Sequence, residues 1–123
     1  AAPLSETITI SRHLRVQELQ SYISLVALQD VRDPTTPPPV ASDTSGRSSQ
    51  RFAMEVVVRK AGQTRRAAVG GRDIYAISAP LVVEAMERML DGRCRMSGVI
   101  TAGEAFDVRD FLAALTPGYL RSG

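Results

Sequence analysis

The most regular pattern of hydrophobic and polar positions lies between residues 52 and 92. Apolar side chains first occupy every second position, at Phe52, Met54, Val56 and Val58. This is the period of a strand with one buried face. After the turn Lys60-Ala61-Gly62-Gln63, residues 64–69 run back with a similar alternation. Because Gly62 can adopt the positive φ of a tight turn, the pattern predicts a β-hairpin.

A helical pattern follows the hairpin. Its apolar residues recur at spacings of three and four, and they are Ile74, Ile77, Leu81, Val82, Ala85, Met86, Met89 and Leu90. We expect Asp73 to cap this helix and Gly92 to end it. Pro80 would remove a hydrogen bond from the helix interior, so the helix either kinks there or starts again at Ser78. One kinked helix over residues 74–90 is the favoured interpretation.

Three other segments suggest strands. Residues 6–12 contain the alternating, β-branched run Thr7-Ile8-Thr9-Ile10, which favours a strand. Residues 17–24 fit a strand face or a helix face; we favour a strand, with a short helical turn near residues 26–30. Residues 97–102 predict a short strand or an extended segment.

A second helix is expected over residues 108–115. Asp107 stands at its N-cap position, and Thr116-Pro117-Gly118 stops it. Together these elements predict an α+β fold, in which an antiparallel or mixed sheet of four to five strands has one face covered by two helices.

The length of 123 residues indicates one domain, residues 1–123. Residues 33–50 are rich in proline and serine, and they have too little apolar surface to offset the entropy of ordering them. We therefore expect a mobile loop there. A loop of this length is either a functional lid or a tolerated surface insertion, and the insertion is favoured.

The charge pattern argues against nucleic acid as a partner. The net charge is only +2, and no aromatic platform lies among the basic residues of the hairpin. Those residues are Arg59, Lys60, Arg65, Arg66 and Arg72. A solvated sheet edge that discourages aggregation is the favoured interpretation.

The apolar runs are also too short to span a membrane, which takes about 20 residues. The only cysteine, Cys94, excludes an internal disulfide and fits a reducing cytoplasm. We therefore expect a cytoplasmic protein without a membrane partner.

The candidate binding residues are few. Arg12, His13 and Arg15 form a cluster that could meet a carboxylate or phosphate, either of a ligand or of a partner domain. Alternatively, His13 is an exposed or interface histidine. Tyr75, on the first turn of the expected helix, is either a ligand contact or a half-buried tyrosine. We treat these four residues as candidate substrate-binding residues.

Neither a metal nor a cofactor is expected in this chain. No cluster of His, Cys and carboxylate residues with metal-ligand spacing accompanies His13. Gly70-Gly71-Arg72-Asp73 lacks the glycine pattern of a dinucleotide site, and the charge of Asp73 would repel a phosphate. A Ser-His-Asp set is spatial and is not excluded by residue order, but no nucleophile elbow is present. No catalytic residue is therefore assigned.

Two segments resemble a known family. They are Gly71-Arg72-Asp73-Ile74-Tyr75-Ala76, followed by Ala79 and Leu81-Val82-Val83-Glu84-Ala85, and Gly103-Glu104-Ala105-Phe106-Asp107, followed by Phe111-Leu112-Ala113-Ala114-Leu115. They look like the C-terminal domain of saccharopine dehydrogenase-like NAD(P)-dependent oxidoreductases. The likeness covers about residues 50–116, with a fainter match from Thr7 to Arg12.

The resemblance implies that this chain is the C-terminal, substrate-side or dimerisation portion of a longer oxidoreductase. In that family an N-terminal Rossmann domain binds NAD(P), and that domain is missing here. The expected partners are thus the Rossmann domain of the same polypeptide and a second copy in a homodimer. The chain alone is expected to have no activity. The rival hypotheses are a free-standing α+β binding or dimerisation module and a small enzyme with an unrecognised site.

Overall fold

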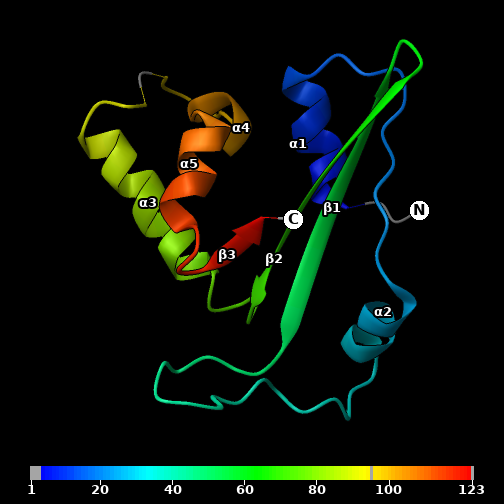
Figure 1. Ribbon diagram of the computed structural model, residues 1–123, viewed down its shortest axis with the longest axis vertical. Coiled ribbons are helices and arrows are strands. Elements are labelled where there is room, and N and C mark those ends of the chain that lie inside the picture. Colours follow the sequence, from blue (N-terminus) through cyan, green and yellow to red (C-terminus); the bar gives the residue numbers. More distant parts are fainter. Residues whose placement is uncertain (1–3, 95, 123) are drawn as a thin grey trace. The chain divides into compact units, whose positions relative to one another are not determined.

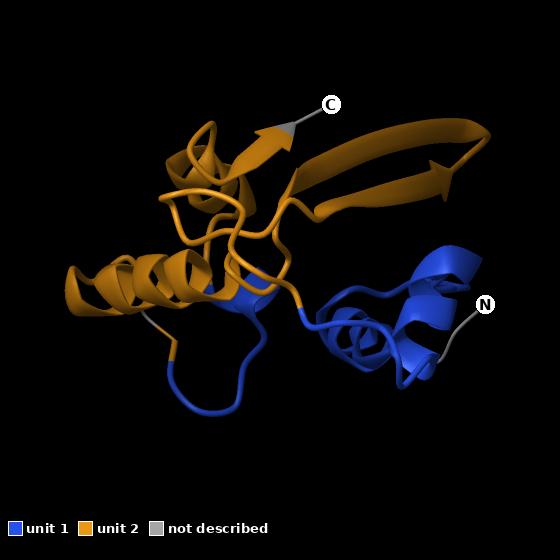
Figure 2. Cartoon of the chain, turned by 90° about the horizontal axis from the view of Figure 1, so that it is seen from below, with its two compact units in different colours: residues 1–38, 97–105 blue, residues 39–96, 106–123 orange. Residues whose placement is uncertain are grey.

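Figure 1 shows the computed structural model, which describes residues 4–94 and 96–122. Its elements are α1 (Ser5–His13), α2 (Leu25–Arg32), β1 (Arg51–Lys60), β2 (Gln63–Arg72), α3 (Ser78–Leu90), α4 (Ala102–Ala105), α5 (Val108–Leu115) and β3 (Leu120–Ser122). They divide into two compact units (Figure 2). The first unit contains Ala1–Pro38 and Ser97–Ala105, and the second contains Pro39–Met96 and Phe106–Gly123.

In the first unit, α1 occupies the segment predicted as a strand over residues 6–12, so that prediction was wrong. The partly covered side chains of this region are Leu4, Thr7, Ile10 and His13. Their spacing of three is helical. The Thr-Ile alternation satisfies both periods, and here the helical period prevails over the weak strand preference of β-branched residues.

The helical turn expected near residues 26–30 is confirmed and extends into the whole of α2. The hydroxyl of Ser24 caps this helix by accepting a hydrogen bond from the amide of Ala27, at 3.1 Å. Residues 17–24 form no strand. Residues 97–102, predicted as a short strand or an extended segment, form no strand either: residues 97–101 lie outside helices and strands, and α4 begins at Ala102.

In the second unit, the β-hairpin is confirmed. β1 and β2 pair antiparallel over ten residues each, from Arg51 opposite Arg72 to Lys60 opposite Gln63. Ala61 and Gly62 form the two-residue connection with φ angles of 49° and 77°. Two positive values define a type I′ turn, whose twist matches that of the strands it joins.

The sheet has three strands in the order β1-β2-β3, so the expected four to five strands are a wrong prediction. The antiparallel arrangement is correct. β3 pairs with the end of β2, from Val69 opposite Ser122 to Gly71 opposite Leu120. With only three residues, β3 is too short to show an alternating pattern, and the sequence therefore did not reveal it.

The helix predicted over residues 74–90 starts at Ser78, so the favoured single kinked helix is wrong and the restart is correct. Pro80 then lies in the first turn, where its missing N–H costs no helical hydrogen bond. Asp73 caps the turn before the helix rather than the helix itself. Its carboxylate accepts hydrogen bonds from the amides of Tyr75 and Ala76. Gly92 ends the helix with a φ of 80°, as expected.

The buried core of the second unit is small. It consists of Ile77, Leu115 and Leu120, with Phe52, Val69, Leu81 and Phe111 packed against it. α5 contributes Leu115 and begins at Asp107, whose carboxylate caps it as predicted. Because the core meets only the Phe52 end of the hairpin, most of β1 stays exposed.

The described helices are short; α3, with 13 residues, is the longest of them. Within residues 4–94 and 96–122, no helix combines the length and the apolar character needed to cross a bilayer.

Candidate functional site

Two of the four candidate binding residues, Arg12 and His13, contact the same segment of the first unit. The Arg12 guanidinium donates a hydrogen bond to the carbonyl oxygen of Val99, at 3.2 Å. His13 Nδ1 lies 3.0 Å from the carbonyl oxygen of Thr9 and 3.4 Å from the hydroxyl of Thr101. A carbonyl oxygen only accepts, so in the contact with Thr9 the donor is Nδ1 of His13.

Thr101 is held by Glu104 rather than activated by His13. The Glu104 carboxylate accepts hydrogen bonds from the Thr101 amide at 2.8 Å and from its hydroxyl at 2.9 Å. These two bonds lower the pKa of the Glu104 carboxyl, the amide contributing most. Thr-x-x-Glu is the pattern of a capping box at a helix start. The arrangement positions α4 and makes no nucleophile-base pair.

The other two candidates stand apart from this contact. Arg15 is exposed, and no hydrogen bond or ion pair involving its side chain occurs among the described residues. Tyr75 belongs to the second unit, and its side chain is 65% exposed. The structure therefore unites Arg12 and His13 but does not unite all four residues in one site.

Arg72, the last residue of β2, joins this strand to the proline- and serine-rich segment. Its guanidinium donates to the carbonyl oxygens of Ser48 and Arg47 and to the hydroxyl of Ser42. It also pairs with the Asp43 carboxylate at 2.6 Å. Hydrogen bonds from Ser45 and from Arg72 lower the pKa of Asp43 to about 2. Arg72 is thus committed to contacts within its own chain rather than to a ligand.

Asp73, the next residue, contacts the same segment. It is buried and has a φ of 59°, in the left-handed region. The amide of Ser48 donates to its carboxylate at 2.7 Å, and this bond is the main cause of the lowered pKa of Asp73. Gly70, Gly71 and Arg72 are thus strand residues of β2 rather than a turn, and the amides of Tyr75 and Ala76 that follow donate to the Asp73 carboxylate.

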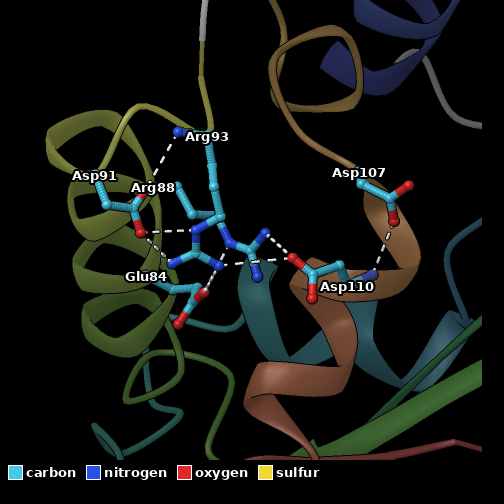
Figure 3. A network of polar contacts seen from close by, with 6 residues as sticks. All are labelled: Glu84, Arg88, Asp91, Arg93, Asp107 and Asp110. Carbon is cyan, nitrogen blue, oxygen red and sulfur yellow. Dashed lines mark hydrogen bonds and ion pairs between the residues drawn. The ribbon is translucent and has the colours of Figure 1, made fainter.

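Figure 3 shows a second cluster of charged side chains, centred on Arg88 of α3. Arg88 is 2% exposed. Its Nε donates to Glu84 at 2.7 Å, and its Nη1 donates to Asp110 of α5 at 2.5 Å. Its guanidinium also lies over the ring of Phe111, 5.0 Å from the centroid. Burial lowers the pKa of Arg88, but the bonds to Asp110 and Glu84 outweigh it and raise the pKa overall.

This Arg88 cluster fastens α3 to α5. The remaining nitrogen, Nη2, is buried and has no hydrogen-bond partner among the described residues. A surface cation, Arg93, completes the network through Asp91 and Glu84. Because the cations and carboxylates of this cluster pair with one another, we assign it a structural role. No group of three or more metal-ligating side chains occurs in the parts of the chain that the structure describes.

The outstanding surface of the second unit is the hairpin. Its apolar face carries Met54, Val56 and Val58, which are 51%, 60% and 56% exposed. β1 is also the edge of the sheet, since β2 is the only one of the described strands that pairs with it. No residue in the described ranges makes a backbone hydrogen bond to the outer side of β1. Exposed apolar side chains beside an open strand edge are typical of an association surface.

Sequence reasoning found the hairpin but took its apolar face to be buried. The alternation is the same in both cases, and it cannot tell whether the chain itself supplies the cover. The contacts of His13 with Thr101 were also missed, although Thr101-Ala102-Gly103-Glu104 carries the capping-box signal that places α4.

Comparison with known proteins gave no match: no family model, curated protein or solved structure resembles this chain significantly.

Proposed function

We propose that this chain is the dimerisation portion, on the substrate side, of a larger cytoplasmic oxidoreductase of the saccharopine dehydrogenase-like kind. The exposed hairpin carries the proposal, because an open edge and an apolar face are features that a second copy can cover. In this proposal NAD(P) binds to a Rossmann domain of the same polypeptide, and the chain alone neither binds the cofactor nor transfers hydride.

The oxidoreductase part of the proposal draws on the resemblance of residues 71–85 and 103–115. In the second unit, parts of both stretches form one packed region, in which Ile77 and Leu115 share the core. Arg88 and Asp110 tie the same two helices together. Matched segments that lie distant in sequence but pack on each other are expected if the likeness reflects a common fold.

A free-standing binding or dimerisation module is the second candidate. The same hairpin favours it, since the surface does not depend on a neighbouring domain. The two candidates differ in the parent reading frame. A strand-turn-helix with G-x-G-x-x-G, encoded upstream and in frame, favours the oxidoreductase, and a start codon directly before Ala1 favours the module.

The shared element of both candidates is tested by mass. Light scattering during size-exclusion chromatography should give about twice the chain mass of 13.3 kDa at high micromolar concentration. A monomer at every concentration up to about 1 mM contradicts the dimerisation role, because a dimer weaker than this gains less than about 4 kcal/mol.

The cofactor part is tested by titrating the chain with NADPH and following the fluorescence of the nicotinamide. We expect no saturable change. A dissociation constant in the micromolar range would overturn the assignment of the cofactor to a separate domain.

A further inference from the structure

We propose that a second copy of this chain adds to the open edge of β1, with the two β1 strands running antiparallel around Val57. The result is a continuous six-stranded sheet across the dimer. This inference rests on the proposed dimerisation and specifies which surface and which register produce it.

The turn geometry identifies the backbone groups that are free to bind the second copy. In a two-residue type I′ hairpin, the residues flanking the turn exchange both of their hydrogen bonds. Here they are Lys60 and Gln63. The bonded pairs then alternate along the ladder, so the even-numbered residues of β1 face β2. Its odd-numbered residues, from Arg51 to Arg59, direct their N–H and C=O groups to the open edge.

An added strand must therefore pair odd-numbered residues with odd-numbered residues. For two identical antiparallel strands, the two-fold axis then passes either through an odd-numbered residue or through an even-numbered residue between two of them. An axis at an even-numbered residue places no basic residue opposite Glu55; an axis at Val56, for example, places Glu55 opposite Val57. An axis at Glu55 places Glu55 opposite itself and Arg51 opposite Arg59, and an axis at Arg59 places Arg59 opposite itself. Like charges directly opposite each other destabilise a sheet, so both registers are disfavoured.

An axis at Val57 gives the opposite result. Val57 meets its own copy, and Glu55 of each chain lies opposite Arg59 of the other, which forms two charge-complementary pairs. An axis at Ala53 also pairs Glu55 with Arg51, but it leaves half of β1, residues 56–60, outside the ladder. Of the registers that place Glu55 opposite an arginine, the Val57 register pairs the most residues of β1.

The charges of the isolated chain are compatible with this register. Glu55 already pairs with Arg66 of β2 at 2.8 Å, with both side chains at least half exposed. In the dimer, Glu55 would lie between Arg66 of its own chain and Arg59 of the other. Its carboxylate would keep the ion pair with Arg66 and add one with Arg59. On the opposite face of the sheet, Val56 of one chain adjoins Val58 of the other, which reduces their exposure.

The register is tested by disulfide capture in a Cys94→Ser background. In a Val57→Cys chain, the two sulfurs should join under mild oxidation, because hydrogen-bonded antiparallel partners have Cα atoms about 5.5 Å apart and a disulfide needs about 4.4–6.8 Å. Ala53→Cys is the matched control, since it lies on the same face and edge. Its two copies would be about 27 Å apart and should not join.

A charge exchange tests the same contact without a disulfide. Glu55→Arg alone, and Arg59→Glu alone, should each weaken the dimer about tenfold or more, because attractive pairs become repulsive ones. The double variant should return to within about threefold of the original dissociation constant. The recovery cannot come from the Glu55–Arg66 pair within one chain, because changing Arg59 does not restore that pair.

The possible results distinguish failure of this inference from failure of the proposed function. A monomer by mass contradicts both. A dimer in which Ala53→Cys joins and Val57→Cys does not, or in which the charge exchange has no effect, overturns the register but leaves the dimerisation role. Circular dichroism of each variant verifies that the hairpin is intact, and capture at Val57 together with the charge-exchange pattern supports the inference.

Discussion

At the scale of single residues, Arg88 shows how competing effects are balanced in this small core. Its burial removes the charge from water, which is costly, and Nη2 has no hydrogen-bond partner among the described residues. Two carboxylates and an aromatic face act in the other direction. Removing one member of a buried pair costs about 3–5 kcal/mol, and an unpaired buried group costs about 1–3 kcal/mol.

Arg88→Met loses the buried ion pair but also removes the unpaired buried nitrogen, so its expected effect is the difference between these two costs. The substitution keeps most of the side-chain volume and removes the unpaired nitrogen. It also removes the ion pair between Arg88 and Glu84, whose side chain is mostly buried. We expect the free energy of unfolding to fall by about 2 kcal/mol, measured by urea denaturation. Arg93→Met is the matched control on the exposed side of the same network and should change stability much less. Equal losses in both variants would show that burial of Arg88 is not decisive.

Among the helices and strands, the sequence predicted correctly those whose ends are marked by a short local motif. The hairpin and α5 were found because a turn and an N-cap mark their ends directly, at Gly62 and Asp107. The strand over residues 6–12 was wrong because alternating Thr and Ile fit both a strand and the helical spacing of α1. β3 was missed since three residues carry no period. The meeting of His13 with Thr101 links positions 88 residues apart, and no pattern in the sequence reveals it.

The hairpin turn gives the prediction at this scale. Ala61 holds a φ of 49°, a left-handed conformation that costs an ordinary residue about 1–2 kcal/mol. Asparagine tolerates this conformation and is preferred at the first position of a type I′ turn. Ala61→Asn should therefore stabilise the chain by about 0.5–1 kcal/mol and raise its Tm in a thermal scan.

Gly62→Ala provides the contrast. Glycine adopts its φ of 77° without a steric penalty, whereas a Cβ makes this conformation costly, so this variant should lower the Tm. If both substitutions shift the Tm in the same direction, the turn is not type I′ in solution.

At the scale of the whole molecule, the α+β character follows from the sequence, but the number of strands and the large exposed area of the hairpin do not. Only Ile77, Leu115 and Leu120 are buried apolar residues in the described chain. A core of this size supplies little stability by itself. Association would then contribute a substantial part of the stability, which makes the Tm depend on protein concentration.

We therefore expect the Tm to rise by about 3 °C for each tenfold increase in protein concentration. A tenfold change is worth about 1.4 kcal/mol per dimer, or half of that per chain. Thermal scans from 5 to 500 μM would measure the slope. The Glu55→Arg variant should give a flatter line, and an equally steep line for that variant would separate the concentration dependence from the hairpin edge.

The position of Lys60 has a practical consequence. It is the only lysine among 15 basic residues, and it stands at the last pair of β1, next to the turn. An amine-directed dye would therefore mark the tip of the hairpin and, apart from the α-amino group, nothing else. Acetylation would remove one positive charge from that tip and leave every arginine unchanged. Dyes attached to Lys60 in two chains would therefore report, by energy transfer, whether the chains associate and how close the two hairpin tips are.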